Sequence, residues 1–109
     1  MIRTTCIAAC MAVTALIFAG TQTHAAKVGE KCGGLGGIIC DRGLWCDPEP
    51  GRCGGRDVEG VCIKVPQVCT KAKEGTKDFR PVCGCNKKTY GNDCERQRHK
   101  VPKDHDGAC

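Results

Sequence analysis

Ten cysteines between residues 32 and 109 constrain the fold of this chain more than any other feature. Such a density is typical of secreted proteins that are too small to be stabilised by a hydrophobic core alone. Each disulfide contributes roughly 2–4 kcal/mol to the free energy of unfolding. Because their number is even, all of them can be bridged. We therefore expect a small disulfide-rich protein built on Cys32, Cys40, Cys46, Cys53, Cys62, Cys69, Cys83, Cys85, Cys94 and Cys109.

The first 25 residues have the features of a secretory signal peptide. Arg3 gives a positively charged start, residues 6–19 form an apolar run without a charge, and residues 23–25 suit a signal peptidase. The apolar run is too short for a membrane span. We therefore expect cleavage after Ala25, secretion to an extracellular or periplasmic destination, and no membrane partner for the mature chain.

The charge of the mature chain is divided unevenly. Residues 26–60 contain five basic and six acidic residues, whereas residues 61–109 contain eleven basic and six acidic ones. A basic surface can bind an acidic partner, but this one lacks the interleaved aromatic residues of a nucleic-acid-binding surface. We interpret it as a solvated face, and we expect a monomer with no nucleic-acid partner.

The first half of the mature chain, residues 26–61, is rich in glycine, which indicates tight turns rather than helices. The apolar runs at 38–40 and 60–63 predict short strands. We expect a knottin-like β-hairpin module held by disulfides. Trp45 is expected to pack over the bridges, a role that we favour over that of a binding anchor because the core is so small.

The second half, residues 62–109, combines an exposed basic loop with one short helix. The loop lies between Cys69 and Cys83. The helix is expected to begin at Asn92, a good N-cap residue that is followed three residues later by Glu95 as in a capping box. Pro102 ends the helical run.

The residue types argue against an enzyme or a metal protein. After removal of residues 1–25 no serine and only two histidines, His99 and His105, remain, so a Ser-His-Asp arrangement is impossible. Cys83 and Cys85 do not have the spacing of a zinc site, and secretion favours their oxidation. We expect no catalysis, no metal and no cofactor.

Three segments resemble a known family. Residues 76–84 (TKDFRPVCG), 88–94 (KTYGNDC) and 105–109 (HDGAC) are similar to the Kazal-type serine protease inhibitor domain, with the resemblance covering residues 62–109. It implies an α+β fold with one short helix and short antiparallel strands. It also implies the bridges Cys69–Cys94 and Cys83–Cys109.

The resemblance implies that an exposed loop inhibits a serine protease reversibly. Lys77 would enter the primary pocket of a protease of trypsin-like specificity, whose floor carries an Asp. Thr76 and Asp78 would brace the bond between Lys77 and Asp78. The other residues that the resemblance places in the loop or behind it are Phe79 and Arg80, with Asn92 and Tyr90 as loop support.

Two departures from the family pattern leave alternatives open. Thirteen residues separate Cys69 from Cys83, where the family usually has seven. Counting forward from Cys69 therefore gives a second candidate bond, between Lys71 and Ala72, although we favour Lys77 for its flanking residues. The longer loop predicts weaker inhibition or cleavage as a substrate. In addition, Gln97 stands where the family helix carries a cysteine, and Cys85 could replace it by pairing with Cys62.

The first half is similar to the small end of the insulin-like growth factor binding protein module over residues 31–62. This likeness suggests the bridges Cys32–Cys46 and Cys40–Cys62, which leaves Cys53 for Cys85. The two resemblances compete for Cys62, and the sequence leaves both pairings open. We expect a secreted inhibitor with three segments: 1–25, 26–61 and 62–109. The alternative is a non-inhibitory binding module that docks on a ligand or an acidic surface through its basic second half.

Overall fold

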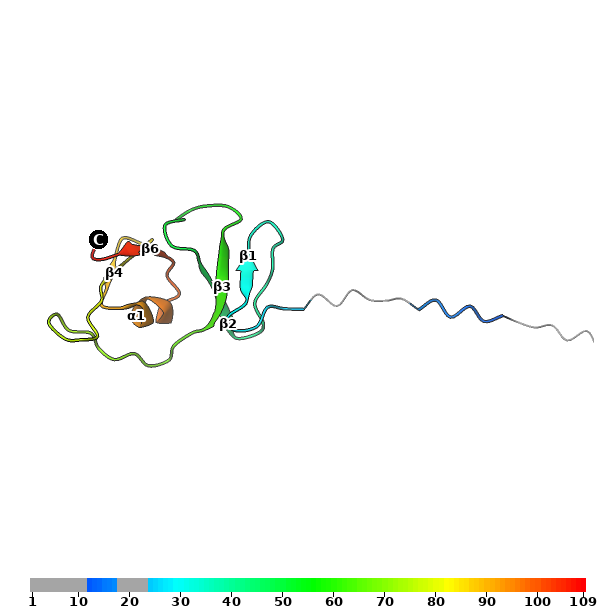
Figure 1. Ribbon diagram of the computed structural model, residues 1–109, viewed down its shortest axis with the longest axis horizontal. Coiled ribbons are helices and arrows are strands. Elements are labelled where there is room, and N and C mark those ends of the chain that lie inside the picture. Colours follow the sequence, from blue (N-terminus) through cyan, green and yellow to red (C-terminus); the bar gives the residue numbers. More distant parts are fainter. Residues whose placement is uncertain (1–11, 18–23) are drawn as a thin grey trace, which may run out of the picture.

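The computed structural model describes residues 12–17 and 24–109, and the chain is seen as two adjoining lobes (Figure 1). Most of the expected signal peptide, including its cysteines, lies outside the described residues. Residues 12–17 have no regular secondary structure. Within the described ranges, the structure has no helix of the length and apolarity needed to span a bilayer.

The first lobe is a three-stranded antiparallel sheet. Its strands are β1 (Lys31–Gly33), β2 (Leu44–Pro48) and β3 (Glu59–Lys64), with β3 in the middle. Cys46 in β2 lies opposite Cys62 in β3. The strand expected at 60–63 is thus confirmed. Residues 38–40 form only isolated bridges, to Gly33 and Ala26, so the strand expected there is wrong, and the lobe has a three-stranded sheet in place of a hairpin.

A few small side chains make up the core of the first lobe. Ala26, Cys32 and Cys62 are buried, and Leu44 packs against them. Ala26 joins the fold through its backbone, since its N–H donates to the carbonyl of Ile39 over 2.8 Å. Trp45, expected over the bridges, is half-buried and lies opposite Ile63 instead of within this cluster. Disulfide sulfurs rather than aromatic rings therefore fill the interior.

The second lobe contains another three-stranded antiparallel sheet and the helix. Strands β4 (Val82–Gly84), β5 (Thr89–Tyr90) and β6 (Lys103–Asp106) pair in the order β5-β4-β6, and β4 is buried along its length. Helix α1 (Asp93–Arg98) begins where the sequence predicts, because the side chain of the N-cap Asn92 accepts a hydrogen bond from the Glu95 N–H over 2.9 Å. Glu95 reaches back to the N–H of Gly91, one residue before the cap.

Five disulfides hold the two lobes. They are Cys32–Cys46 and Cys40–Cys62 in the first lobe, Cys69–Cys94 and Cys83–Cys109 in the second, and Cys53–Cys85 between them. The pairings that the two resemblances imply are confirmed. The alternative pairing of Cys62 with Cys85 is wrong, because Cys62 belongs to the sheet of the first lobe. Strand β3 runs across the expected boundary between residues 61 and 62.

Candidate functional site

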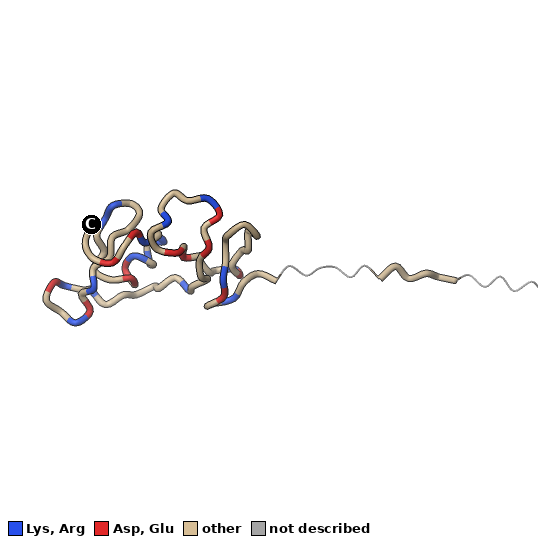
Figure 2. The backbone as a smooth tube through the Cα atoms, turned by 45° about the horizontal axis from the view of Figure 1, so that its top comes forward, with Lys and Arg blue, Asp and Glu red and all other residues tan. Residues whose placement is uncertain are grey.

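Residues 70–80 form an exposed loop that projects from the end of the second lobe remote from the first (Figure 1). Figure 2 shows basic and acidic residues alternating around its tip. The basic residues of this loop, Lys71, Lys73, Lys77 and Arg80, are all exposed. The loop therefore offers several lysines to a partner on a narrow projection.

Separate disulfides anchor the two ends of the loop. Cys69 is bonded to Cys94 in α1, and Cys83 is bonded to Cys109 at the end of the chain. The N–H of Arg80 also donates to the carbonyl of Gly91 over 2.9 Å. Each end thus stays attached to the lobe independently of the continuity of the loop.

Asn92 contacts both helix α1 and the start of the loop. Its Oδ1 caps α1, and its Nδ2 donates to the carbonyl of Thr70 over a long distance of 3.5 Å. Ala72 is half-buried and lies close enough to Gly91 that a Cβ there would stand 3.0 Å from the Cβ of Ala72. These contacts hold the residues on both sides of Lys71 against the lobe.

The tip of the loop is a turn that is bonded within itself. The hydroxyl of Thr76 donates to the carbonyl of Lys73 over 2.7 Å, and the N–H of Phe79 donates to the carbonyl of Thr76 over 3.1 Å. Gly75 has a φ of +88°, which favours glycine. The Thr76 hydroxyl thus serves the turn rather than a contact across the bond after Lys77.

The bond between Lys77 and Asp78 also lies near Asn92. Lys77 and Asp78 line an open groove of about 1040 Å³ together with Thr70, Asn92 and Cys94. Tyr90, expected to support the loop, lies elsewhere: it pairs with Val82 in the sheet, its hydroxyl accepts a hydrogen bond from Asn86 over 2.8 Å, and its ring lies 5.8 Å from that of His99. It stabilises the turn between β4 and β5.

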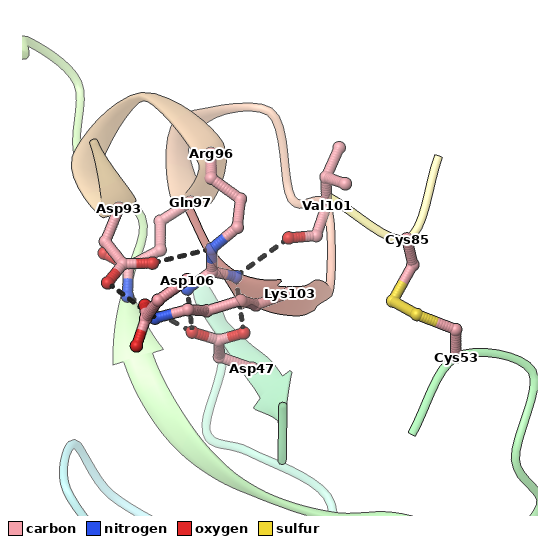
Figure 3. A network of polar contacts seen from close by, with 9 residues as sticks. All are labelled: Asp47, Cys53, Cys85, Asp93, Arg96, Gln97, Val101, Lys103 and Asp106. Carbon is pink, nitrogen blue, oxygen red and sulfur yellow. Dashed lines mark hydrogen bonds and ion pairs between the residues drawn. A yellow bond between two sulfur atoms is a disulfide. The ribbon is translucent and has the colours of Figure 1, made fainter. Parts of the chain in front are cut away.

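A buried ion pair behind the loop was not predicted from the sequence. Arg96 in α1 is 3 % exposed, and its guanidinium donates to both carboxylate oxygens of Asp47 in β2 over 2.9 and 3.0 Å (Figure 3). It also donates to Asp93 over 2.9 Å and to the Val101 carbonyl over 2.8 Å. Burial alone lowers the pKa of Arg96, but the hydrogen bonds and charges of the two carboxylates outweigh it, and this pKa lies above its ordinary value.

Gln97 also contacts the carboxylate of Asp47. Its Nε2 donates to Oδ2 of Asp47 over 3.2 Å. Two neighbouring helix residues, Arg96 and Gln97, therefore meet one side chain of the first lobe. Asp47 and Arg96 are 49 residues apart, so no local pattern in the sequence could have indicated the pair.

A second ionic cluster lies beside the first. Lys103 in β6 forms ion pairs with Asp93, over 3.3 Å, and with Asp106 (Figure 3). The hydrogen bond to Asp106 is the main cause that raises the pKa of Lys103, against the opposing effect of burial. The same bond lowers the pKa of Asp106.

The sequence matches the model of the Kazal-type serine protease inhibitor domain over residues 46–109, which is more than half of the chain. The match begins within β2 and so includes Asp47 as well as the loop. Comparison with curated proteins found no match.

Proposed function

The chain belongs to the Kazal-type serine protease inhibitor family, and from that membership we propose that it is a secreted, reversible inhibitor of a serine protease of trypsin-like specificity. The trypsin-like preference rests on the lysines of the loop, because a lysine suits a primary pocket with an Asp at its floor. Secretion rests on the signal-like residues 1–25 and on the disulfides. We also propose that the mature chain divides into residues 26–61 and 62–109, with β3 shared between them. The likeness of the first part to the insulin-like growth factor binding protein module is likewise a proposal.

The observation that carries this proposal is the separate anchoring of the two ends of the loop. If a protease cleaves a bond within residues 70–80, the new amino and carboxyl ends remain attached through Cys69–Cys94 and Cys83–Cys109. The leaving amine therefore stays near the acyl-enzyme and can reform the bond. A loop already held in shape also loses little conformational entropy when it docks.

The flanking residues in the sequence favour Lys77, but the contacts around Lys71 lead us to propose instead the bond between Lys71 and Ala72 as the reactive bond. Three contacts support it: the adjacent Cys69–Cys94 bridge, the hydrogen bond from Asn92 to Thr70, and the packing of Ala72 near Gly91. The bond between Lys77 and Asp78 is the second candidate. Its flanking residues resemble the family motif and it lines the groove beside Asn92, but it follows the self-contained turn of the loop tip.

Titration of oxidised residues 26–109 against trypsin, with mass spectrometry of the mixture, tests the proposal. Lys71→Ala should weaken inhibition by about 30- to 1,000-fold, because a lysine that fills a buried pocket contributes roughly 2–4 kcal/mol. Lys73→Ala removes a lysine of the same loop and is the matched control, for which little change is expected. If Lys77→Ala shows the large effect and Lys71→Ala does not, the second bond is the reactive one.

A non-inhibitory binding module is the second candidate function, and the excess of basic residues in 61–109 favours it. In that case all loop lysines would contribute similar small amounts, and binding to an acidic partner would weaken steadily with salt. Rapid cleavage of the loop by trypsin without inhibition would exclude the inhibitor function for this target class and favour the binding module.

A further inference from the structure

The helix of the second lobe lacks the cysteine that its family resemblance leads one to expect. Gln97 stands at that position, so within the second lobe α1 is cross-linked only through Cys94, near its start. The helix has six residues, and a helix so short is not stable by itself. Other contacts must hold its second turn.

The first lobe supplies those contacts. Asp47 accepts two hydrogen bonds from Arg96 and one from Gln97, and the side chains of Asp47 and Arg96 are 13 % and 4 % exposed. A bidentate guanidinium–carboxylate pair fixes direction as well as distance. Since it is shielded from water, removing one partner leaves a buried charge without its counterpart, which is strongly unfavourable.

The first turn of the same helix holds the loop. Arg96 donates to Asp93, which follows Asn92. Asn92 contacts Thr70 at the start of the loop, and Gly91 accepts the N–H of Arg80 at its end. A continuous series of contacts therefore leads from β2, through α1, to both ends of the loop.

We propose that Asp47 is a positioning residue for the reactive loop, and that its contacts with Arg96 and Gln97 take the place of the absent helix disulfide. The proposal rests on the proposed inhibitor function for its consequence in protease binding. It assigns the first lobe a part in that function, since the loop keeps its shape only while β2 holds α1.

The test compares Asp47→Asn with Glu49→Gln in oxidised 26–109. Asparagine keeps the shape of Asp47 but removes its charge. Glu49 is exposed and close by in sequence, and within residues 12–17 and 24–109 its side chain has no hydrogen-bond partner. In Asp47→Asn, amide exchange of Arg80 should quicken on the order of tenfold. Exchange of the Cys62 N–H, which donates to the carbonyl of Glu30 just before β1, should stay as in the parent. Trypsin inhibition should weaken, and cleavage within 70–80 should quicken, by a similar factor.

Glu49→Gln should leave all three measurements unchanged. Unchanged exchange at Arg80 in Asp47→Asn with native disulfides would overturn the proposal, and so would a uniform rise at every amide, which indicates loss of stability alone. Gln97→Ala removes a single hydrogen bond and should move Arg80 exchange and cleavage a few-fold in the same direction, which keeps the test available if Asp47→Asn does not fold. If the parent fails to inhibit trypsin, the inhibitor function fails for that enzyme, while amide exchange still decides the positioning role.

Discussion

Gly60 shows how closely two strands of the first lobe approach each other. A Cβ at this position would overlap the carbonyl of Asp47 in the neighbouring strand. The glycine thus allows β3 to lie against the residue whose side chain binds Arg96. The ion pair between the lobes therefore depends indirectly on a small residue at position 60.

Gly60→Ala should lower the free energy of unfolding by about 1–3 kcal/mol, because the added methyl group forces β2 and β3 apart. Gly36→Ala is the matched control, since a Cβ there would meet only Ile38 at 3.7 Å. Urea unfolding of both variants measures the difference. Equal midpoints for the two variants would contradict the close approach of the strands.

The cluster around Lys103 predicts a dependence of stability on pH. The pKa of Asp106 is lowered in the folded state, so its carboxylate stabilises the fold above the ordinary carboxyl pKa. This stabilisation is lost as the pH falls through the lower folded value. The raised pKa of Lys103 has its effect at high pH. The stability that its positive charge contributes is lost as the pH rises through the raised value. In urea unfolding, Asp106→Asn should be less stable than the parent at pH 7, and the difference should shrink as the pH falls below the ordinary carboxyl pKa and through the lower folded value. A difference that persists in acid would mean that the carboxylate charge is not its cause.

At the scale of elements, α1 depends on its N-cap. Asn92→Ala removes the acceptor for the Glu95 N–H and should cost about 1 kcal/mol of stability. It also removes the contact with Thr70, so cleavage within 70–80 by trypsin should quicken. Asn86→Ala, an asparagine in the turn between β4 and β5, serves as the control and should leave the cleavage rate unchanged. Lower stability without quicker cleavage would show that Asn92 caps the helix but does not hold the loop.

Local signals explain which elements could be predicted from the sequence. Asn92 and Glu95 define the start of α1 within a few residues, and the apolar run at 60–63 predicts β3. The run at 38–40 was misleading because its apolar side chains are exposed and the chain there forms isolated bridges. Strand β2 was not predicted, since it pairs with a separate segment of the chain, β3, through the close approach that Gly60 allows. The candidate loop followed from its spacing between cysteines, whereas the partner of Arg96 lies too far along the chain for any local pattern.

At the scale of the whole molecule, a disulfide and an ion pair are among the contacts that join the lobes. The disulfide is Cys53–Cys85, and the ion pair is the one between Asp47 and Arg96. They reach the second lobe at different places, the turn after β4 and helix α1. The exposed loop at residues 70–80 is therefore supported by a body that comprises both lobes.

Replacement of Cys53 and Cys85 together by Ser should reduce the free energy of unfolding by up to roughly 3–4 kcal/mol, the entropic contribution expected for a closed loop of 32 residues. The ion pair should still align the lobes, so trypsin inhibition at low temperature should change little. Urea unfolding and inhibition titration of this variant measure the two effects. Complete loss of inhibition in a variant that keeps its four other disulfides would show that the disulfide, and not Asp47, sets the position of α1.

Lys71 and Lys77 lie at opposite ends of the segment that lengthens the loop. Cleavage after both of them limits how long an inhibitor of this kind stays intact. After a single cut the protease can reseal the chain, because both ends remain attached. Cuts after both Lys71 and Lys77 hydrolyse two peptide bonds with two water molecules and free residues 72–77 as a peptide. The amine that must attack for resealing then diffuses away, and the inhibitor is consumed. Such an inhibitor blocks the protease only for a limited time, and the rate of the second cut sets that time.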